Sequence, residues 1–296
     1  MAEPLFARGR VTVLGVLNTT PDSFSDGGRF VRAASRACSD AGEHEELLLG
    51  AAVEVALELA RSGADAIDVG GESTRPGARQ VPAAVEIART APVIAALAKR
   101  SSVPVAIDTR KASVAEAALD AGASIVNDVS GGAFDPALLG VAARRGVWLV
   151  LGHARGTPET MQRDPRFDDP LQEVGDELAA AIERALAAGV ARERIVADPG
   201  IGFGKRLQDN LALLANVGRL GLRLGVPVMV GPSRKSFLGA LTGDGPGERD
   251  AATVAACATA VFAGADALRV HDVPSGVRAA QVGLALRRAR ADGVAP

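Results

Sequence analysis

The chain has 296 residues, of which 48% are hydrophobic, and its formal net charge is -2. This balance excludes a general affinity for nucleic acid or for an anionic membrane, so a local cluster of cations must hold any bound anion. Residues 1–10 contain no apolar run of signal-peptide or membrane-spanning length, and Cys38 and Cys257 form no metal or redox spacing. We therefore expect a cytoplasmic protein without a membrane segment.

Eight short apolar runs recur along the chain, and each ends in glycine or a small polar residue. Their apolar character is continuous, without alternation, which indicates parallel strands that are covered on both faces. They lie at residues 11–18, 65–71, 103–108, 125–130, 147–153, 195–200, 227–233 and 267–272. Ala- and Leu-rich segments between them, such as 47–61, 112–121, 171–188 and 251–263, are typical of crossover helices.

Eight β/α units in one chain predict a closed (β/α)8 barrel of the TIM type, with the active site at the C-terminal ends of the strands. A doubly wound open sheet is the alternative, but no dinucleotide or Walker fingerprint supports it, and the glycines of 200–205 have the wrong spacing. No linker divides the chain, so residues 1–296 are expected to form a single domain. Residues 30–46 lack a clear period and are expected to be an insertion of low order.

The first strand ends at Asn18, and a loop rich in small polar residues follows it. Asn18 suits a metal or phosphate oxygen, while Asp22 and Asp26 suit a positive charge or a divalent cation. An Asx-turn cluster that only caps the loop is the alternative. In the second loop, Arg75 follows Thr74 in a turn stiffened by glycine and proline, and its planar fork matches a phosphate.

Carboxylates and amides end the middle strands at Asp108, Asn127, Asp128 and Asp198. A ring of such groups around a barrel mouth can recognise a flat heterocycle with many N–H donors. A single aspartate there could be a cap, but three at corresponding strand ends favour a binding site. His153, at the fifth strand end, is equally compatible with a structural role.

The last two strand ends carry cations. The sequence has only four lysines, so Lys235 at the end of a buried strand is a functional candidate, with a solvated basic turn as the alternative. Strand alternation places Arg269 and His271 on one face. These two residues are predicted to form an anion clamp with Asn18 and Arg75, since the last loops of such barrels often bind phosphate.

Seven motifs in register identify a family. Residues 18–28, 68–77, 107–109, 127–130, 198–205, 233–236 and 269–272 resemble, in order, the motifs of the dihydropteroate synthases of folate biosynthesis. The resemblance implies a (β/α)8 barrel. It also implies a protein that is usually a homodimer and that sulfonamides inhibit. It also implies a Mg2+-assisted reaction in which p-aminobenzoate and 6-hydroxymethyl-7,8-dihydropterin pyrophosphate give 7,8-dihydropteroate and pyrophosphate.

The resemblance also implies roles for single residues. The pterin pocket would contain Asp108, Asn127, Asp198, Lys235 and Arg269, with Arg269 stacked over the ring. The pyrophosphate would contact Asn18, Arg75, Arg269 and His271, with Asn18 also near the metal. The p-aminobenzoate side would contain Thr74, Pro76, Phe203, Lys235 and Ser236. The catalytic set would be Asp26, Lys235, Arg269 and His271, with Asp26 stabilising the pterin methylene cation.

One strand end departs from the family pattern. The family commonly has Leu-Met-His-Met there, whereas this chain has Gly152 and Ala154 in place of the two methionines. We expect the loss of two thioethers to enlarge the pterin pocket. Two other functions are considered, a pterin-dependent methyltransferase domain and a non-catalytic pterin-binding paralogue. The motifs on the p-aminobenzoate side and the leaving-group clamp disfavour them.

Overall fold

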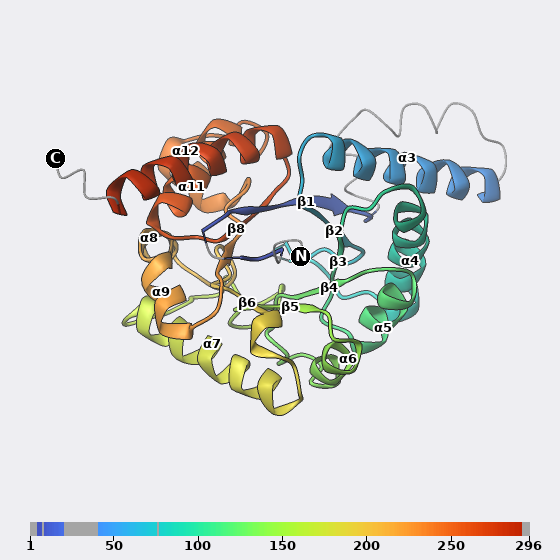
Figure 1. Cartoon of the computed structure of the whole chain (residues 1–296), viewed down its shortest axis with the longest axis horizontal. Helices are drawn as coiled ribbons and strands as arrows, with labels where there is room; N and C mark the ends of the chain where they lie inside the picture. The colour runs from blue at the N-terminus through green and yellow to red at the C-terminus, as the bar shows by residue number, and fades with distance from the viewer. Residues whose placement is uncertain (1–4, 8, 21–40, 76, 292–296) are drawn as a thin grey trace.

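Eight parallel strands form the barrel, and helices surround it (Figure 1). The computed structural model describes residues 5–7, 9–20, 41–75 and 77–291. The hydrogen-bonded order is β6-β5-β4-β3-β2-β1-β8-β7. A parallel bridge between Ala197 and Val228, with the Ala197 amide donating to the Pro227 carbonyl at 2.9 Å, brings the two ends of this order together. The (β/α)8 barrel is therefore confirmed, and the open sheet is excluded.

The strands and helices alternate along the chain. The strands are β1 (Thr12–Asn18), β2 (Ala66–Gly70), β3 (Val105–Asp108), β4 (Ile125–Asp128), β5 (Trp148–Gly152), β6 (Ile195–Asp198), β7 (Met229–Val230) and β8 (Ala267–Val270). The first helices are α3 (Ala41–Arg61), α4 (Ala83–Arg100), α5 (Ala112–Asp120), α6 (Ala137–Arg145) and α7 (Pro170–Ala187). After the short η1 (Arg192–Arg194) come α8 (Leu207–Ala215), α9 (Val217–Leu224), α10 (Ser236–Thr242), α11 (Asp250–Ala263) and α12 (Val273–Ala291).

Alternation along each strand divides the core into two layers. Outward side chains pack under the helices, while inward side chains fill the barrel. The inward layer contains Leu14, Ala66, Ala106, Ile125, Val150, Val196, Met229 and Ala267. Phe6 packs edge-on against Trp148 in this inner cluster, with ring centroids 5.0 Å apart. The barrel is therefore a packed core, and a ligand can bind only beyond this layer, toward the C-terminal ends of the strands.

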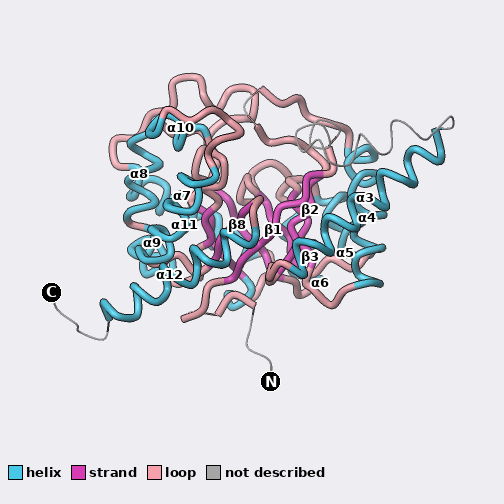
Figure 2. Tube along the Cα trace, turned by 90° about the horizontal axis from the view of Figure 1, so that it is seen from above, coloured by secondary structure: helices cyan, strands magenta, loops and turns pink. Residues whose placement is uncertain are grey.

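The next inward positions lie one layer nearer the C-terminal ends of the strands and are polar. They include Asp68, Asp108, Asn127, Asp198 and Arg269, each two residues beyond an apolar inward residue of the same strand. Figure 2 shows the long loops gathered at one end of the barrel. The sequence pattern therefore located the chemically active end.

The observed elements match the expected ones closely, except that β7 covers only Met229–Val230 of the expected run 227–233 and that one helix begins earlier. Helix α3 begins at Ala41, so residues 41–46 of the expected insertion are helical. Residues 30–40 lie outside the described residues. None of the described helices is long and apolar enough to cross a membrane.

Candidate active site

Arg269 connects three strands, β8, β2 and β3, inside the barrel mouth. Its Nε donates to Asp68 Oδ2, and its Nη2 donates to Asp108 Oδ2 at 2.7 Å. Asn127 Nδ2 donates to the same oxygen of Asp68 at 3.1 Å. Burial raises the pKa of Asp108 to about 7, although the charge of Arg269 lowers it. One guanidinium thus organises two carboxylates and, through Asp68, an amide.

Asp198 and Lys235 form the opposite wall of the mouth. Burial raises the pKa of Asp198, while the hydrogen bond from the Gly200 amide and then the charge of Lys235 lower it. Burial lowers the pKa of Lys235 to about 8, and the charge of Arg269 lowers it further. Lys235 Nζ lies 3.6 Å from the centroid of the Phe203 ring, a cation–π contact.

The backbone turn before Lys235 explains its position. Arg234 has φ of +58°, a left-handed conformation that is costly for a residue with a side chain. Its guanidinium pairs with Asp250 at 2.8 Å, and its amide donates to Thr253 Oγ1 at 3.0 Å. Helix α11 therefore holds this turn, and Ser236 begins α10 directly after it.

Cationic side chains lie around His271. Burial lowers its pKa to about 3, and four nearby charges lower it further, those of Arg269, Arg234, Lys235 and Arg75. The backbone N–H of His271 donates to Ser233 Oγ at 3.3 Å, and this hydroxyl lies 3.0 Å from His271 Nδ1. We therefore assign a neutral imidazole that accepts the hydroxyl proton at Nδ1 and carries its own proton on Nε2.

A buried ion cluster anchors the loop that carries Thr74 and Arg75. Glu72 pairs with Arg110 at 2.6 Å and with Lys111 at 2.7 Å, and Lys111 also contacts Glu86 at 2.5 Å. Although burial raises the pKa of Glu72, hydrogen bonds from Lys111 and Arg110 lower it more. Arg75 is exposed on this fixed loop.

Asn18 ends β1 at the same mouth. A Cβ added to the neighbouring Gly70 would lie 3.6 Å from Asn18 Oδ1 and 3.7 Å from Asp108 Oδ2. Glycine at position 70 thus leaves the space between these two oxygens open. Among the described residues no three His, Cys, Asp or Glu side chains gather as metal ligands. Asp22, Asp26 and Pro76 lie outside the described residues.

For two carboxylates the structure differs from the sequence-based prediction of the ring. Asp128, expected to belong to the ring, turns to its own loop and accepts from the Ser130 amide at 2.8 Å and the Gly132 amide at 2.7 Å. Asp68 is fully buried in the ring instead. Its position two residues before Gly70 in an otherwise apolar strand is the signal that could have identified it.

His153 serves a buried polar network behind the mouth. Lys205 Nζ donates to His153 Nδ1 at 2.9 Å and to the Phe203 carbonyl at 3.0 Å, and His153 Nε2 lies 2.9 Å from Glu177. Burial lowers the pKa of His153, as it lowers the pKa of Lys205 to about 7. These contacts tie the loop after β6 to the end of β5, which is a structural role.

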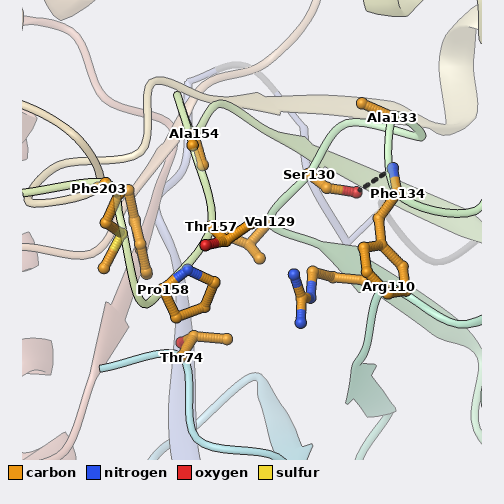
Figure 3. Close-up of a pocket in the computed structure, with 12 residues that line it drawn as sticks. Thr74, Arg110, Val129, Ser130, Ala133, Phe134, Ala154, Thr157, Pro158 and Phe203 are labelled. Atoms are coloured by element: carbon orange, nitrogen blue, oxygen red, sulfur yellow. Dashed lines mark hydrogen bonds between the residues drawn. The ribbon is translucent and has the colours of Figure 1, made fainter. Parts of the chain in front are cut away.

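At the end of β5, the replacement of the two methionines of the family pattern by Gly152 and Ala154 has a different consequence at each position. A Cβ on Gly152 would lie 2.6 Å from the Val129 Cα, so neighbouring backbone already fills that space. The expected enlargement of the pterin pocket is therefore wrong at position 152. Ala154, in contrast, lines a cavity of about 270 Å3 (Figure 3). The cavity is also lined by Thr74, Arg110, Val129, Ser130, Ala133, Phe134, Gly156, Thr157, Pro158, Met161 and Phe203.

Known proteins share this architecture and sequence. The family model described as pterin binding enzyme matches residues 38–271. The chain is 43% identical over 290 residues to a dihydropteroate synthase of Synechocystis sp., which covers 97% of this chain and 94% of that protein.

Two solved structures are also similar. A Yersinia pestis dihydropteroate synthase with a sulfonamide drug complex has a TM-score of 0.84 and 39% identity, covering 94% of this chain and 95% of that chain. A Xanthomonas albilineans dihydropteroate synthase in complex with 7,8-dihydropteroate has a TM-score of 0.78 and 39% identity, covering 97% and 95%. The similarity therefore extends over nearly the whole barrel.

Proposed function

The chain belongs to the dihydropteroate synthase family of pterin-binding transferases, and we propose that its barrel mouth joins p-aminobenzoate to 6-hydroxymethyl-7,8-dihydropterin pyrophosphate. The products are 7,8-dihydropteroate and pyrophosphate. The observation that carries the assignment of this site is one hydrogen-bond network opposite Asp198 and Lys235. In this network Arg269 donates to Asp68 and Asp108, and Asn127 donates to Asp68. A methyltransferase domain and a non-catalytic paralogue are not favoured. The proteins that are similar over nearly the whole chain are named dihydropteroate synthases.

The pterin is proposed to bind to Asp108, Asn127, Asp198 and Lys235. Carboxylate and amide oxygens accept hydrogen bonds from the N–H groups of the heterocycle, and Lys235 donates to it. Arg269 Nη2 donates to Asp108 Oδ2 in the described arrangement, and we propose that a pterin N–H takes the place of this donor. The released guanidinium then lies over the ring, a contact that its planar shape favours.

The pyrophosphate is proposed to lie among Asn18, Arg75, Arg269 and His271. Four cationic charges surround His271, which makes this corner of the mouth electropositive. A neutral imidazole with its proton on Nε2 can donate to a phosphate oxygen without losing a proton. Arg75 supplies a fork that matches the oxyanion.

Mg2+ is proposed to accompany the pyrophosphate at Asn18. The described residues fit such an ion, because Mg2+ commonly takes one or two protein oxygens and completes its shell with phosphate and water. Asn18 Oδ1 is an oxygen donor of this kind, beside the space that Gly70 leaves open. When bound, the ion stabilises the charge of the departing pyrophosphate.

The p-aminobenzoate is proposed to lie against Thr74, Phe203, Lys235 and Ser236, with Pro76 in the same loop. Phe203 offers an aromatic face, and its own contact with Lys235 holds that ammonium between the two organic substrates. Loss of pyrophosphate precedes attack by the arylamine nitrogen, which needs no strong general base. Asp26 is proposed to stabilise the intermediate methylene cation.

We also propose that the protein is a cytoplasmic homodimer and a sulfonamide target. Val282 and Leu286 are exposed one turn apart on α12, with exposed fractions of 56% and 55%, which suits a contact with a second copy. Size-exclusion chromatography with light scattering tests this state. A sulfonamide would occupy the p-aminobenzoate side, so p-aminobenzoate should relieve its inhibition.

A pyrophosphate-release assay tests the reaction. The purified protein should release pyrophosphate from the dihydropterin pyrophosphate in the presence of p-aminobenzoate and Mg2+, and it should form dihydropteroate in equal amount. Omission of p-aminobenzoate or chelation of Mg2+ serves as the control. If a folded protein forms no dihydropteroate under any of these conditions, the proposal is wrong.

A further inference from the structure

The cavity beside Ala154 adjoins the p-aminobenzoate side of the mouth. Thr74 and Phe203 belong to both, whereas none of the five proposed pterin residues is among the described residues that line the cavity. Figure 3 shows Phe203 and Phe134 on opposite sides of the view, with Ala154 above and Thr74 below. Space that opens from Thr74 and Phe203 is therefore space next to the arylamine.

Hydrogen bonds fix the wall formed by residues 156–162. The Gly77 amide donates to the Pro158 carbonyl at 2.9 Å, and Gln162 Nε2 donates to the Gly202 carbonyl at 2.8 Å. Gly156 has φ of +83°, and a Cβ there would lie 3.1 Å from the Met161 Cα. This segment is thus attached to the loops after β2 and β6.

The lining favours a flat ring with one hydrogen-bond acceptor. Aliphatic and aromatic side chains form most of the wall, and hydroxyls of Thr74, Ser130 and Thr157 interrupt it. The Arg110 guanidinium lies over the Phe134 ring at 4.3 Å. A volume of about 270 Å3 is slightly below the roughly 300 Å3 minimum of drug-sized pockets, so it suits a single ring.

The local charge limits the ligand further. Arg110 and Lys111 are balanced by Glu72 and Glu86 in one buried cluster. A group with several negative charges would find no excess of positive charge here, whereas a neutral carbonyl can accept from a wall hydroxyl such as that of Thr74. The cavity therefore differs from the pyrophosphate corner around His271.

We propose that this cavity is a specificity subsite through which the enzyme accepts p-aminobenzoates that carry a second flat ring with one acceptor. Ala154 determines this specificity, because a longer side chain at position 154 would occupy the cavity. The proposal rests on the proposed function, since it names a wider arylamine class for the same reaction.

The test compares kcat/KM for p-aminobenzoate with kcat/KM for 4-aminobenzoates bearing a benzoyl group ortho or meta to the amine. The parent enzyme should use at least one isomer within about tenfold of p-aminobenzoate. Ala154→Met should lower that value by roughly 30-fold or more while changing p-aminobenzoate use less than about threefold. Ala180→Met, an exposed position on α7, is the matched control and should change neither.

A second variant keeps the test decisive if Ala154→Met folds poorly. Phe134 is 41% exposed, so Phe134→Ala should fold normally, and it should lower use of the benzoyl substrate several-fold without changing p-aminobenzoate use. Rejection of both isomers by the parent, or an unchanged ratio in the folded variants, overturns the subsite.

Failure of the reaction itself is distinguishable. If the parent does not use p-aminobenzoate, the proposed function fails, and calorimetric binding of the benzoyl compounds then tests the cavity alone. Binding that Ala154→Met weakens supports the subsite, and absence of binding or equal binding overturns it.

Discussion

Arg269 Nη2 donates to Asp108 Oδ2 at 2.7 Å across the barrel mouth, between the ends of β8 and β3. The pair joins a cation and an acceptor that are both proposed to contact the pterin. Because Asp68 also binds Arg269 through Nε, the guanidinium can release Asp108 and keep one carboxylate partner. In the proposed account, binding of the pterin is thus an exchange of hydrogen-bond partners at Asp108.

Asp108→Asn should reduce kcat/KM for the dihydropterin pyrophosphate by on the order of 100-fold. The variant loses charge-assisted hydrogen bonds, which contribute about 1.5–3 kcal/mol each. KM for p-aminobenzoate should change little. Initial rates at varied concentrations of each substrate measure both values, and Asp120→Asn, an exposed position, is the control. Equal loss for the two substrates would contradict the assignment.

Asp68→Asn should disturb the pterin site through Arg269 and Asn127. Removal of a buried carboxylate from Arg269 leaves the guanidinium less well held, so kcat/KM for the pterin substrate should fall at least tenfold, or about 1.4 kcal/mol. Asp65→Asn is the matched control at the other end of β2, where Asp65 accepts from the Val13 amide at 2.8 Å. Thermal unfolding should show that both variants lose stability, and only Asp68→Asn should alter pterin use.

Gly152→Ala should destabilise the barrel by roughly 1–3 kcal/mol, because the added Cβ meets the backbone of Val129 and Asp128. Gly50→Ala provides the opposite control. It lies exposed in α3 with no atom within 4 Å of its added Cβ, and alanine there should stabilise the helix by about 1 kcal/mol. Urea unfolding of the three proteins checks the difference. A Gly152→Ala protein as stable as the parent would contradict the close approach of β4 and β5.

The pH dependence of kcat/KM for the pterin substrate should be a narrow bell. Burial raises the pKa of Asp108 to about 7, and its ionised form must accept from the pterin, so activity falls as pH decreases through 7. Burial lowers the pKa of Lys235 to about 8, and its cation must donate, so activity falls as pH increases through 8.

Variants assign the two limbs of this profile. Burial lowers the pKa of Lys205 to about 7, so Lys205 titrates near the same pH as Asp108. Asp108→Asn should therefore abolish the acid limb, whereas Lys205→Met should leave it in place. Lys235→Arg should remove the alkaline limb. Persistence of the acid limb in Asp108→Asn would exclude Asp108 as its source.

Lys235→Ala should impair use of both substrates, because Lys235 contacts Phe203 and faces Asp198. Asp26→Ala should mainly lower kcat, since its proposed role begins only after pyrophosphate departs. Steady-state kinetics of the two variants separate these effects. Full turnover by Asp26→Ala would refute the cation-stabilising role.

Much of this site follows from the apolar runs and the polar residues that end them. These runs predicted the barrel, its active end and a ring at the mouth that contains Asp108, Asn127 and Asp198. The role of Asp128 could not be read in this way, because a residue at the last strand position can turn into its own loop. The tertiary approach of Val129 to Gly152 likewise depends on two strands at once, which sequence spacing along one strand does not report.

Asp68 was missed for a related reason. A carboxylate in the middle of an apolar strand is costly unless it is paired, and its partner Arg269 is 201 residues away in the chain. Asp68 on β2 and Arg269 on β8 meet only because β1 pairs with both strands.

A crystal structure of the protein with the dihydropterin pyrophosphate tests the partner exchange most directly. We predict that the pterin N–H groups donate to Asp108, that Arg269 Nη2 leaves this carboxylate, and that Arg269 Nε stays on Asp68 beneath a guanidinium stacked over the ring. An intact Arg269–Asp108 pair with the pterin bound elsewhere would contradict the account.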